Sequence, residues 1–381
     1  MDRFKSSSIV LQKMQNFRIF FSTSIKLIGI YSHLIYSYSL SPYTARKISS
    51  PSLKPYFICK QRQISRASVT RFLDTSSAQL SLVSWDEGDA NISSEVISVN
   101  FFFSRKCNYS CKFCFHTAKN DYTLPLEKVY EGIKLLKEAG CEKINFAGGE
   151  PFLHPFELGM MVQQCNKLGI EVSIISNASC ISPPWMKNFG KYVDVLGVSL
   201  DSFDPVTNGF IGRGADVDNK HLSRVLNVRD LCEKYNIKFK VNTVVSTLNW
   251  KEDMNTNINL LNPMRWKVFQ VLLLHGENSG ANGDLRDVRN LLITNDMFQS
   301  FVDRHSAACP QLVPEPNNLM KDSYIMLDEK MRFLNCQCGS KTPTDSILEV
   351  GVNNALKQAG FNKKAFLKRG GIFDWNKTKG L

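Results

Sequence analysis

The chain has 381 residues, of which 43% are hydrophobic and 22% are charged, and it contains 11 cysteines. This length and composition exclude a peptide, a disulfide-stapled mini-protein and a fully disordered chain, and at roughly 150 residues per domain they predict about two to three units. The cysteines are too sparse and too unevenly spaced for an extracellular disulfide framework, which favours an intracellular thiol or metal role.

The net charge of +12 is concentrated at the start of the chain. Residues 1–71 hold 12 of the 47 Lys and Arg residues and only one of the 35 Asp and Glu residues, so they carry +11 and residues 72–381 carry +1. A nearly neutral body predicts no broad basic surface, and we therefore expect no direct contact with nucleic acid.

Residues 1–71 form a leader that combines basic, apolar and Ser residues with almost no acids. This composition is typical of a transit peptide or of a helix that lies on a membrane surface, and a basic tail without a target is the remaining alternative. A membrane-spanning helix is not expected, because the uncharged stretch 27–45 contains His33, several Ser residues and a Pro. Residues 72–94 lose the positive charge and are predicted to form a linker.

Strands and helices are predicted to alternate from residue 95 to residue 290. The clearest amphipathic helices are residues 126–139, between Pro125 and Gly140, and residues 222–235. Apolar, β-branched runs typical of strands occupy residues 96–103, 143–146, 171–176, 193–200, 237–245 and 266–274. The alternation predicts an α/β fold with a helix-covered parallel sheet, either an open doubly wound sheet or a partial barrel.

In either fold, ligands bind at the carboxyl ends of the strands. No GxGxxG follows the first strand, so the sequence gives no support for a dinucleotide site. The less regular residues 291–381 are predicted to form a C-terminal extension that covers the active site.

Three cysteines follow the first predicted strand within one short loop: Cys107, Cys111 and Cys114. Three thiolates on such a loop can face a common centre and leave one metal coordination position open. A structural zinc ion would need a fourth ligand, for which His116 is the nearby candidate. Cys336 and Cys338 are too few to hold an auxiliary cluster without partners.

The CxxxCxxC spacing, with Phe113 before the last cysteine, resembles the signature of the radical S-adenosylmethionine (SAM) enzymes. The resemblance implies a partial (β/α)6 TIM-like barrel in which Cys107, Cys111 and Cys114 hold a 4Fe-4S cluster. In that family the fourth iron binds SAM, and one electron from a donor cleaves SAM to a 5′-deoxyadenosyl radical that abstracts hydrogen from the substrate.

Further motifs at predicted strand ends match SAM contacts of the same family. Gly148-Gly149-Glu150-Pro151 follows the second strand, where glycines permit a close approach of a ligand and Glu150 can accept from an ammonium group. The resemblance implies that SAM is contacted by Phe113, Gly148, Gly149, Glu150, Asn177, Ser199 and Arg213. A simple turn and polar caps of buried strands are the structural alternatives for these residues.

Cations alternate with apolar residues on two neighbouring predicted strands. Lys240 and Asn242 share one face of their strand, and Arg265 and Lys267 repeat this spacing on the next strand. Three cations on one face of the barrel lumen would be costly to bury unpaired, so the pattern favours an anionic ligand such as a triphosphate. Alternatively, these side chains reach the strand starts or pair with Asp or Glu.

Longer strings over about residues 96–371 resemble the viperins, a family of interferon-induced antiviral radical SAM enzymes. Among them are CNYSCKFCFHTAK, LLKEAGCEKINFAGGEPF, YVDVLGVSLDSFD and FLKRGG. The resemblance implies a lyase that dehydrates CTP to 3′-deoxy-3′,4′-didehydro-CTP in antiviral defence and innate immunity. By the same resemblance, Asn100, Lys143, Asn145 and Tyr324 join Lys240, Asn242, Arg265 and Lys267 at the nucleotide, and Tyr324 is a candidate proton donor.

The family also implies recognition by the iron-sulfur assembly machinery. It further implies attachment to the cytosolic face of the endoplasmic reticulum and to lipid droplets. The composition of the leader leaves the mitochondrion as an alternative location. Three features depart from the family. The leader resembles the viperin amphipathic helix only in being apolar and basic. Ala147 stands where vertebrate viperins have Ser, and six residues follow Trp375 where viperins end at a Trp.

Two other functions remain open at this stage. One is a radical SAM enzyme on another nucleotide such as UTP, because cations that bind a triphosphate do not select the base. The other is a membrane-tethered antiviral interaction protein whose cluster is structural.

Overall fold

The computed structural model describes residues 96–214 and 220–372. The predicted leader, the linker, Trp375 and the chain end after residue 372 lie outside the described residues. Within the described ranges, no helix is both long enough and apolar enough to cross a membrane.

Six parallel strands form the centre of the fold, one for each predicted strand, although the sixth strand ends four residues earlier than predicted. They are β1 (Ser98–Phe102), β2 (Lys143–Ala147), β3 (Glu171–Ser176), β4 (Val195–Ser199), β5 (Lys238–Val245) and β6 (Arg265–Gln270). Each strand pairs in parallel with the next one in the chain, so all six carboxyl ends meet at one edge.

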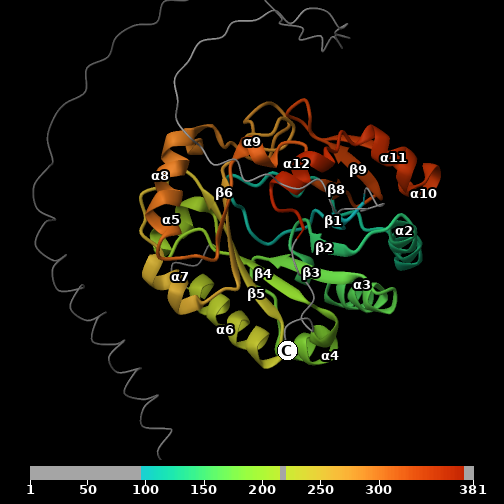
Figure 1. Cartoon of the computed structure of the whole chain (residues 1–381), viewed down its shortest axis with the longest axis horizontal. Helices are drawn as coiled ribbons and strands as arrows, with labels where there is room; N and C mark the ends of the chain where they lie inside the picture. The colour runs from blue at the N-terminus through green and yellow to red at the C-terminus, as the bar shows by residue number, and fades with distance from the viewer. Residues whose placement is uncertain (1–95, 215–219, 373–381) are drawn as a thin grey trace, which may run out of the picture. The chain divides into compact units, whose positions relative to one another are not determined.

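Helices connect these strands and cover the outer face of the curved sheet (Figure 1). They are α2 (Leu126–Glu138), α3 (Pro155–Lys167), α4 (Pro183–Phe189), α5 (Pro205–Ile211), α6 (Lys220–Lys234) and α7 (Asn255–Leu261), with short 3-10 turns η2 (Pro151–Leu153), η3 (Gly190–Tyr192) and η4 (Arg289–Leu291). Helix α2 shows the physical cause: it starts after Pro125, and Val129, Ile133 and Leu136 recur on the face that it buries.

The C-terminal part extends the same sheet at both edges. Strand β7 (Leu312–Glu315) pairs with β6, and β8 (Ile325–Leu327) pairs with β1, both in parallel. Beyond β8 lie the antiparallel strands β9 (Arg332–Asn335) and β10 (Thr342–Ser346). The remaining helices are α8 (Asn295–Ser306), α9 (Asn317–Met320), α10 (Ile347–Val350), α11 (Val352–Gln358) and α12 (Lys363–Lys368).

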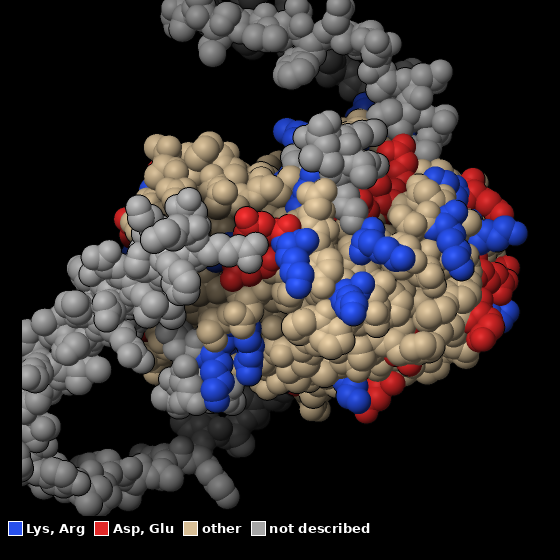
Figure 2. Space-filling view, turned by 90° about the horizontal axis from the view of Figure 1, so that it is seen from below, with Lys and Arg blue, Asp and Glu red and all other residues tan. Residues whose placement is uncertain are grey.

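The apolar core lies between the sheet and its helices. Trp266 of β6 is fully buried and packs edge-to-face on Phe301 of α8, while its strand neighbours Arg265 and Lys267 take the opposite face of the sheet. On the face shown in Figure 2, Lys and Arg side chains are scattered among Asp, Glu and uncharged areas. Such a mixed surface is what the nearly neutral body predicts.

Candidate active site

The three cysteines lie on the loop between β1 and α2, at the carboxyl edge of the sheet. Cys111 is buried, Cys107 and Cys114 are half-buried, and all three thiols are free. The backbone NH of Cys114 donates to the Cys111 carbonyl at 3.1 Å, and that of Lys112 donates to the Ile211 carbonyl at 2.9 Å. The loop is therefore folded on itself and fastened to the end of α5.

Gly148 and Gly149 allow the chain after β2 to touch the cysteine loop. A Cβ atom on Gly148 would lie 2.3 Å from the Ser104 carbonyl oxygen, and one on Gly149 would lie 1.9 Å from that of Lys106. The backbone NH of Gly149 instead donates to Ser104, and that of Glu150 to Lys106, each at 2.8 Å. A side chain at either position would collide with the backbone of the cysteine loop, so both glycines are needed for this packing even without a ligand.

The Glu150 carboxylate is buried and joins the segments that follow β2 and β3. Oε1 accepts from the Ser176 hydroxyl at 2.7 Å, and Oε2 accepts from the Asn177 backbone NH at the same distance. Burial raises the pKa of Glu150, against the lowering effect of these hydrogen bonds. The Asn177 amide donates to Asn108 of the cysteine loop at 2.9 Å. The ends of β2 and β3 therefore hold one side of this loop.

Arg213 lies on the other side of the loop. Its guanidinium donates to the buried Asp201 and lies over the Phe113 ring, 5.4 Å from the centroid. Burial raises the pKa of Cys111 to about 12, and the charge of Arg213 acts in the opposite direction. Ser199 is buried at the end of β4, where its carbonyl is bonded to the His221 ring.

The His116 ring contacts a lysine and an aromatic ring. Its Nδ1 is 2.9 Å from Lys341 Nζ, and its ring lies 4.6 Å from that of Phe102. Because the ammonium group can only donate, Nδ1 is the acceptor. His116 Nδ1 is therefore engaged in a protein contact, while its Nε2 is buried without a hydrogen-bond partner among the described residues. The described residues contain no group of three or more His, Cys, Asp or Glu side chains preformed as a metal site, but three free thiols on one loop have the ligand chemistry that an iron-sulfur cluster needs.

Buried cations line the lumen of the barrel. The register pairs Lys240 with Arg265 and Asn242 with Lys267, which places all four on one face, as the alternation predicts. Lys143 of β2 joins them, and none of the four cations is more than 8% exposed. The pKa values of Lys143 and Lys240 lie well below the usual range, first because of burial and second because Lys267 is charged. Several basic groups thus share one desolvated space, which disfavours their charged forms until an anion is bound.

Two residues that the sequence did not single out, Glu315 and Arg369, complete this group. Glu315 is fully buried at the end of β7 and accepts from Lys267 and, at 3.2 Å, from Arg369. Burial raises the pKa of Glu315, but the charges of Lys267 and Arg369 outweigh it and lower the value. The Glu315 carboxylate therefore offsets part of the positive charge. For Lys267 the structure shows the alternative considered from the sequence, in which a cation of these strands pairs with Asp or Glu.

Tyr324 lies between these groups, just before β8. Its hydroxyl oxygen accepts from Lys267 Nζ at 3.2 Å, and the Arg369 guanidinium lies 3.8 Å from the centre of its ring. Burial and the Glu315 charge raise the pKa of Tyr324, whereas burial lowers that of Lys267 to about 8. At neutral pH Tyr324 is therefore protonated, and Lys267 is the group of the pair whose pKa lies closer to this range.

Asn100 and Asn145 face each other across β1 and β2. The Asn145 amide donates to Asn100 Oδ1 at 2.8 Å, and Asn100 donates to the Ile325 carbonyl at 3.3 Å. These bonds leave Asn145 Oδ1 buried without a hydrogen-bond partner among the described residues, and Asn242 Oδ1 is in the same state. Both side-chain oxygens can therefore still accept a hydrogen bond.

No local signal marks Glu315 or Arg369 in the sequence. Both lie outside the β/α units, and they meet Lys267 only because β7 pairs with β6 and α12 returns to the sheet. The string FLKRGG contains Arg369, but nothing in that string tells which residue it contacts. Of the other eight cysteines, Cys59 lies outside the described residues. Cys141, Cys165, Cys232 and Cys309 are buried, Cys180 and Cys336 are half-buried, and Cys338 is exposed.

The class of protein follows from this arrangement and from comparison with known proteins. Residues 101–256 match the family model of the radical SAM superfamily. The fold is similar to a solved structure described as native anSMEcpe with bound AdoMet, with a TM-score of 0.54, 16% identity, and coverage of 71% of this chain and 84% of that one. The chain is a radical SAM protein with the predicted partial barrel.

More specific relatives share most of the chain. Two are named S-adenosylmethionine-dependent nucleotide dehydratase RSAD2. The one from Oncorhynchus mykiss is 52% identical over 286 residues, which are 74% of this chain and 81% of the relative. The one from Siniperca chuatsi is 51% identical over 287 residues, with 74% and 80% covered. The chain belongs to the S-adenosylmethionine-dependent nucleotide dehydratases, the viperin family, which confirms the prediction from the sequence. Its cofactors are the 4Fe-4S cluster and SAM.

Proposed function

We propose that this enzyme dehydrates CTP to 3′-deoxy-3′,4′-didehydro-CTP. The observation that carries the substrate class is the buried group of Lys143, Lys240, Arg265 and Lys267 in the lumen. A triphosphate would bring further negative charge to this group of cations, and charge-assisted hydrogen bonds would form in a site from which water is excluded. The names of the relatives, nucleotide dehydratases, support the same class.

Cys107, Cys111 and Cys114 would hold the cluster, and Glu150, Asn177, Ser199 and Arg213, with Gly148, Gly149 and Phe113, would surround SAM. Cluster and SAM together supply the radical that takes the C4′ hydrogen of the nucleotide. The protein's part is to fix the nucleotide. The cations would bind the phosphates, and the open acceptors Asn145 Oδ1 and Asn242 Oδ1 suit ribose hydroxyl groups.

The rest of the reaction removes the 3′-hydroxyl as water, which takes up one proton and one electron. Tyr324 is our candidate for the proton donor. Lys267 donates to its oxygen, and the phenol O–H has the Glu315 carboxylate as its acceptor, so a bound nucleotide would have to replace Glu315 as the acceptor. The raised pKa keeps the phenol protonated before the reaction. Lys267 could then return the proton, since a pKa of about 8 allows it to exchange with solvent near neutral pH.

The partners beyond the nucleotide are also proposals. An electron donor is required by the stoichiometry, and the iron-sulfur assembly machinery by the cluster. We further propose that residues 1–71 attach the enzyme to the cytosolic face of the endoplasmic reticulum and to lipid droplets. The support is the basic, apolar composition of this leader, which also suits mitochondrial import.

The test is anaerobic reconstitution with iron and sulfide, followed by incubation with SAM, dithionite and each nucleoside triphosphate in turn. We expect CTP alone to stimulate formation of 5′-deoxyadenosine and to yield a product lighter by one water. Equal turnover with UTP would refute the base assignment. Loss of SAM cleavage for every nucleotide, with a fully loaded cluster, would instead favour a structural cluster in an interaction protein.

A further inference from the structure

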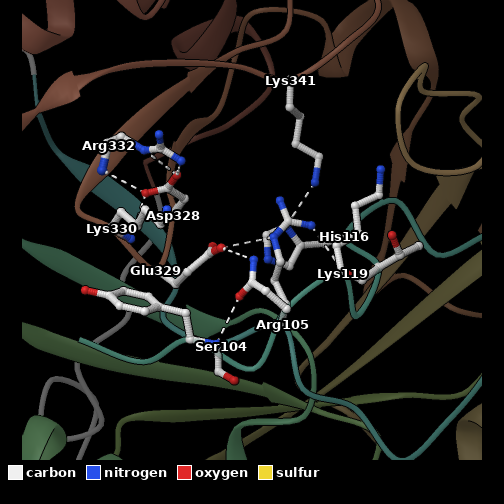
Figure 3. Close-up of polar contacts among 12 residues, drawn as sticks. Ser104, Arg105, His116, Lys119, Asp328, Glu329, Lys330, Arg332 and Lys341 are labelled. Carbon is white, nitrogen blue, oxygen red and sulfur yellow. Dashed lines mark hydrogen bonds and ion pairs between the residues drawn. The ribbon is translucent and has the colours of Figure 1, made fainter. Parts of the chain in front are cut away.

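A buried network of charged residues contacts both ends of the cysteine loop. Glu277 lies in the segment between β6 and α8, Glu329 follows β8, and Lys341 precedes β10. Arg105 precedes the first cysteine and contacts both carboxylates. Figure 3 shows its contact with Glu329. The two acids are 4% and 3% exposed. None of these four residues takes part in the function proposed above.

Glu277 connects the two ends of the cysteine loop. Its Oε1 accepts from Arg105 Nη1 at 3.0 Å, before the first cysteine. Its Oε2 accepts from the Thr117 backbone NH at 2.9 Å and from the Thr117 hydroxyl at 2.6 Å, after the last cysteine. Arg105 also donates to the Thr117 carbonyl at 3.1 Å, which closes the ring directly. All three cysteines lie between the two residues that this carboxylate holds.

The same network ties the loop to the C-terminal part of the chain. Lys341 Nζ lies 2.9 Å from Glu277 Oε1, and Arg105 Nε donates to Glu329 at 3.2 Å. Asn120, beyond the cysteines, donates to Glu329 at 2.9 Å. The two segments that supply Lys341 and Glu277 are themselves joined, because the NH of His275 donates to the Gly339 carbonyl at 2.9 Å. The loop cannot open without breaking contacts to residues that are more than 150 positions away in the sequence.

The charges of the network balance, which makes each of them hard to remove. Two cations and two carboxylates are buried together, so the loss of one charge leaves another uncompensated. Burial raises the pKa of Glu277, but Lys341 and the Thr117 hydrogen bonds lower it further, to about 2. The carboxylate is therefore ionised throughout the pH range in which the protein is handled.

We propose that Glu277 is a positioning residue for the iron-sulfur cluster: by holding residues 105 and 117 together it keeps the three thiols in place and prevents loss of the cluster. Arg105, Thr117, Glu329 and Lys341 act with it. The proposal rests on the cluster of the radical SAM family and does not depend on which nucleotide is the substrate.

The test compares Glu277→Gln with Asp328→Asn in the full-length enzyme. Asp328 is a matched control, since it is 2% exposed and accepts four hydrogen bonds, from Lys330 and Arg332, whereas these hydrogen bonds stay within residues 328–332 and do not reach the cysteine loop. Glu277 likewise accepts four, from Arg105, Lys341 and Thr117. Both variants should lower the melting temperature of the cluster-free protein.

The deciding measurement is the rate at which the cluster absorbance is lost to an iron chelator, without nucleotide and well below the melting temperature of either variant. We expect Glu277→Gln to lose the cluster about tenfold faster than the wild type, the factor that corresponds to one charge-assisted hydrogen bond. Asp328→Asn should lose it at the wild-type rate. Equal acceleration in both variants, or none in Glu277→Gln, overturns the proposal.

A milder variant serves if Glu277→Gln fails to fold. Thr117→Val keeps the shape of the side chain and the backbone NH bond but lacks the hydroxyl that donates to Glu277. Its cluster should be lost faster than that of the wild type, by up to about tenfold, because one hydrogen bond to the ionised Glu277 carboxylate is removed while the backbone NH bond remains. A wild-type rate in this variant contradicts the positioning role.

Discussion

Replacement of Lys267 by Met tests the nucleotide site most directly. Lys267 is 5% exposed and donates to both Glu315 and Tyr324, so its ammonium group is fixed in the lumen. Methionine retains much of the apolar stem but has no charge. In this variant Glu315 keeps Arg369 as its ion-pair partner among the described residues, and its carboxylate charge would oppose an incoming triphosphate.

The size of the effect follows from these contacts. A hydrogen bond to a charged group contributes about 1.5–3 kcal/mol, which corresponds to roughly a 10- to 150-fold change in affinity. Lys267 forms an ion pair with Glu315 in the free enzyme, and the Glu315 charge weakens the attraction between Lys267 and a phosphate group. We therefore expect Lys267→Met to weaken CTP binding by about tenfold to 50-fold.

The assay is anaerobic calorimetric titration of the reconstituted enzyme with CTP. Lys187→Met is the charge-matched control, since Lys187 is an exposed residue in the last turn of the outer helix α4. The cluster absorbance must be unchanged in both variants, because Lys267 has no part in holding the cysteines. An unchanged dissociation constant in Lys267→Met, with a loaded cluster, would refute the assignment of the lumen cations to the triphosphate.

Four further predictions address other parts of the molecule. Since the pKa of Lys267 is lowered to about 8, its charge is present below this pH and lost above it, so CTP affinity should fall between pH 7 and pH 9 in calorimetric titrations; a constant affinity would contradict this. Gly149→Ala should lower the melting temperature and the iron content together, because its Cβ would lie 1.9 Å from the Lys106 carbonyl oxygen; wild-type values of both would show that the loop yields. Cys111→Ala should abolish cluster absorbance and SAM cleavage while the circular dichroism spectrum is retained, and residual cleavage would argue against the cluster assignment. A fusion of residues 1–71 to a fluorescent protein should mark the endoplasmic reticulum and lipid droplets, whereas a mitochondrial signal would support the alternative and a diffuse signal would exclude both.

The strands and the cysteine loop could be predicted because their signals are local. Period-two alternation placed Lys240 and Asn242 on one face of β5, and the same reasoning placed Arg265 and Lys267 on β6. The pairing of these residues across the two strands needs no further information once the sheet is known to be parallel. The sixth predicted strand was too long because residues 271–274 are apolar, although the Leu274 NH bonds to the Asn278 side chain instead of to a strand.

The role of the GGEP glycines could be predicted only in part. The sequence indicated that a close approach occurs there, but it could not tell which atoms approach. In the structure they are the carbonyl oxygens of Ser104 and Lys106, which belong to the cysteine loop. The motif therefore has a packing role that is independent of SAM, and a substitution at Gly149 affects the cluster through the backbone. Sequence motifs of this kind combine contacts to a ligand with contacts between segments.

The C-terminal part escaped prediction because its order in space differs from its order in the chain. Strand β7 joins one edge of the sheet and β8 the other, although only nine residues separate Glu315 from Ile325. This crossing carries Tyr324 and Glu315 to the same side of the lumen, where Lys267 contacts both. At its other end β8 leads directly to Glu329 and the cysteine loop. A three-residue strand thus joins the proposed proton donor to the residues that hold the cluster, which is why displacement of the C-terminal part would disturb both sites together.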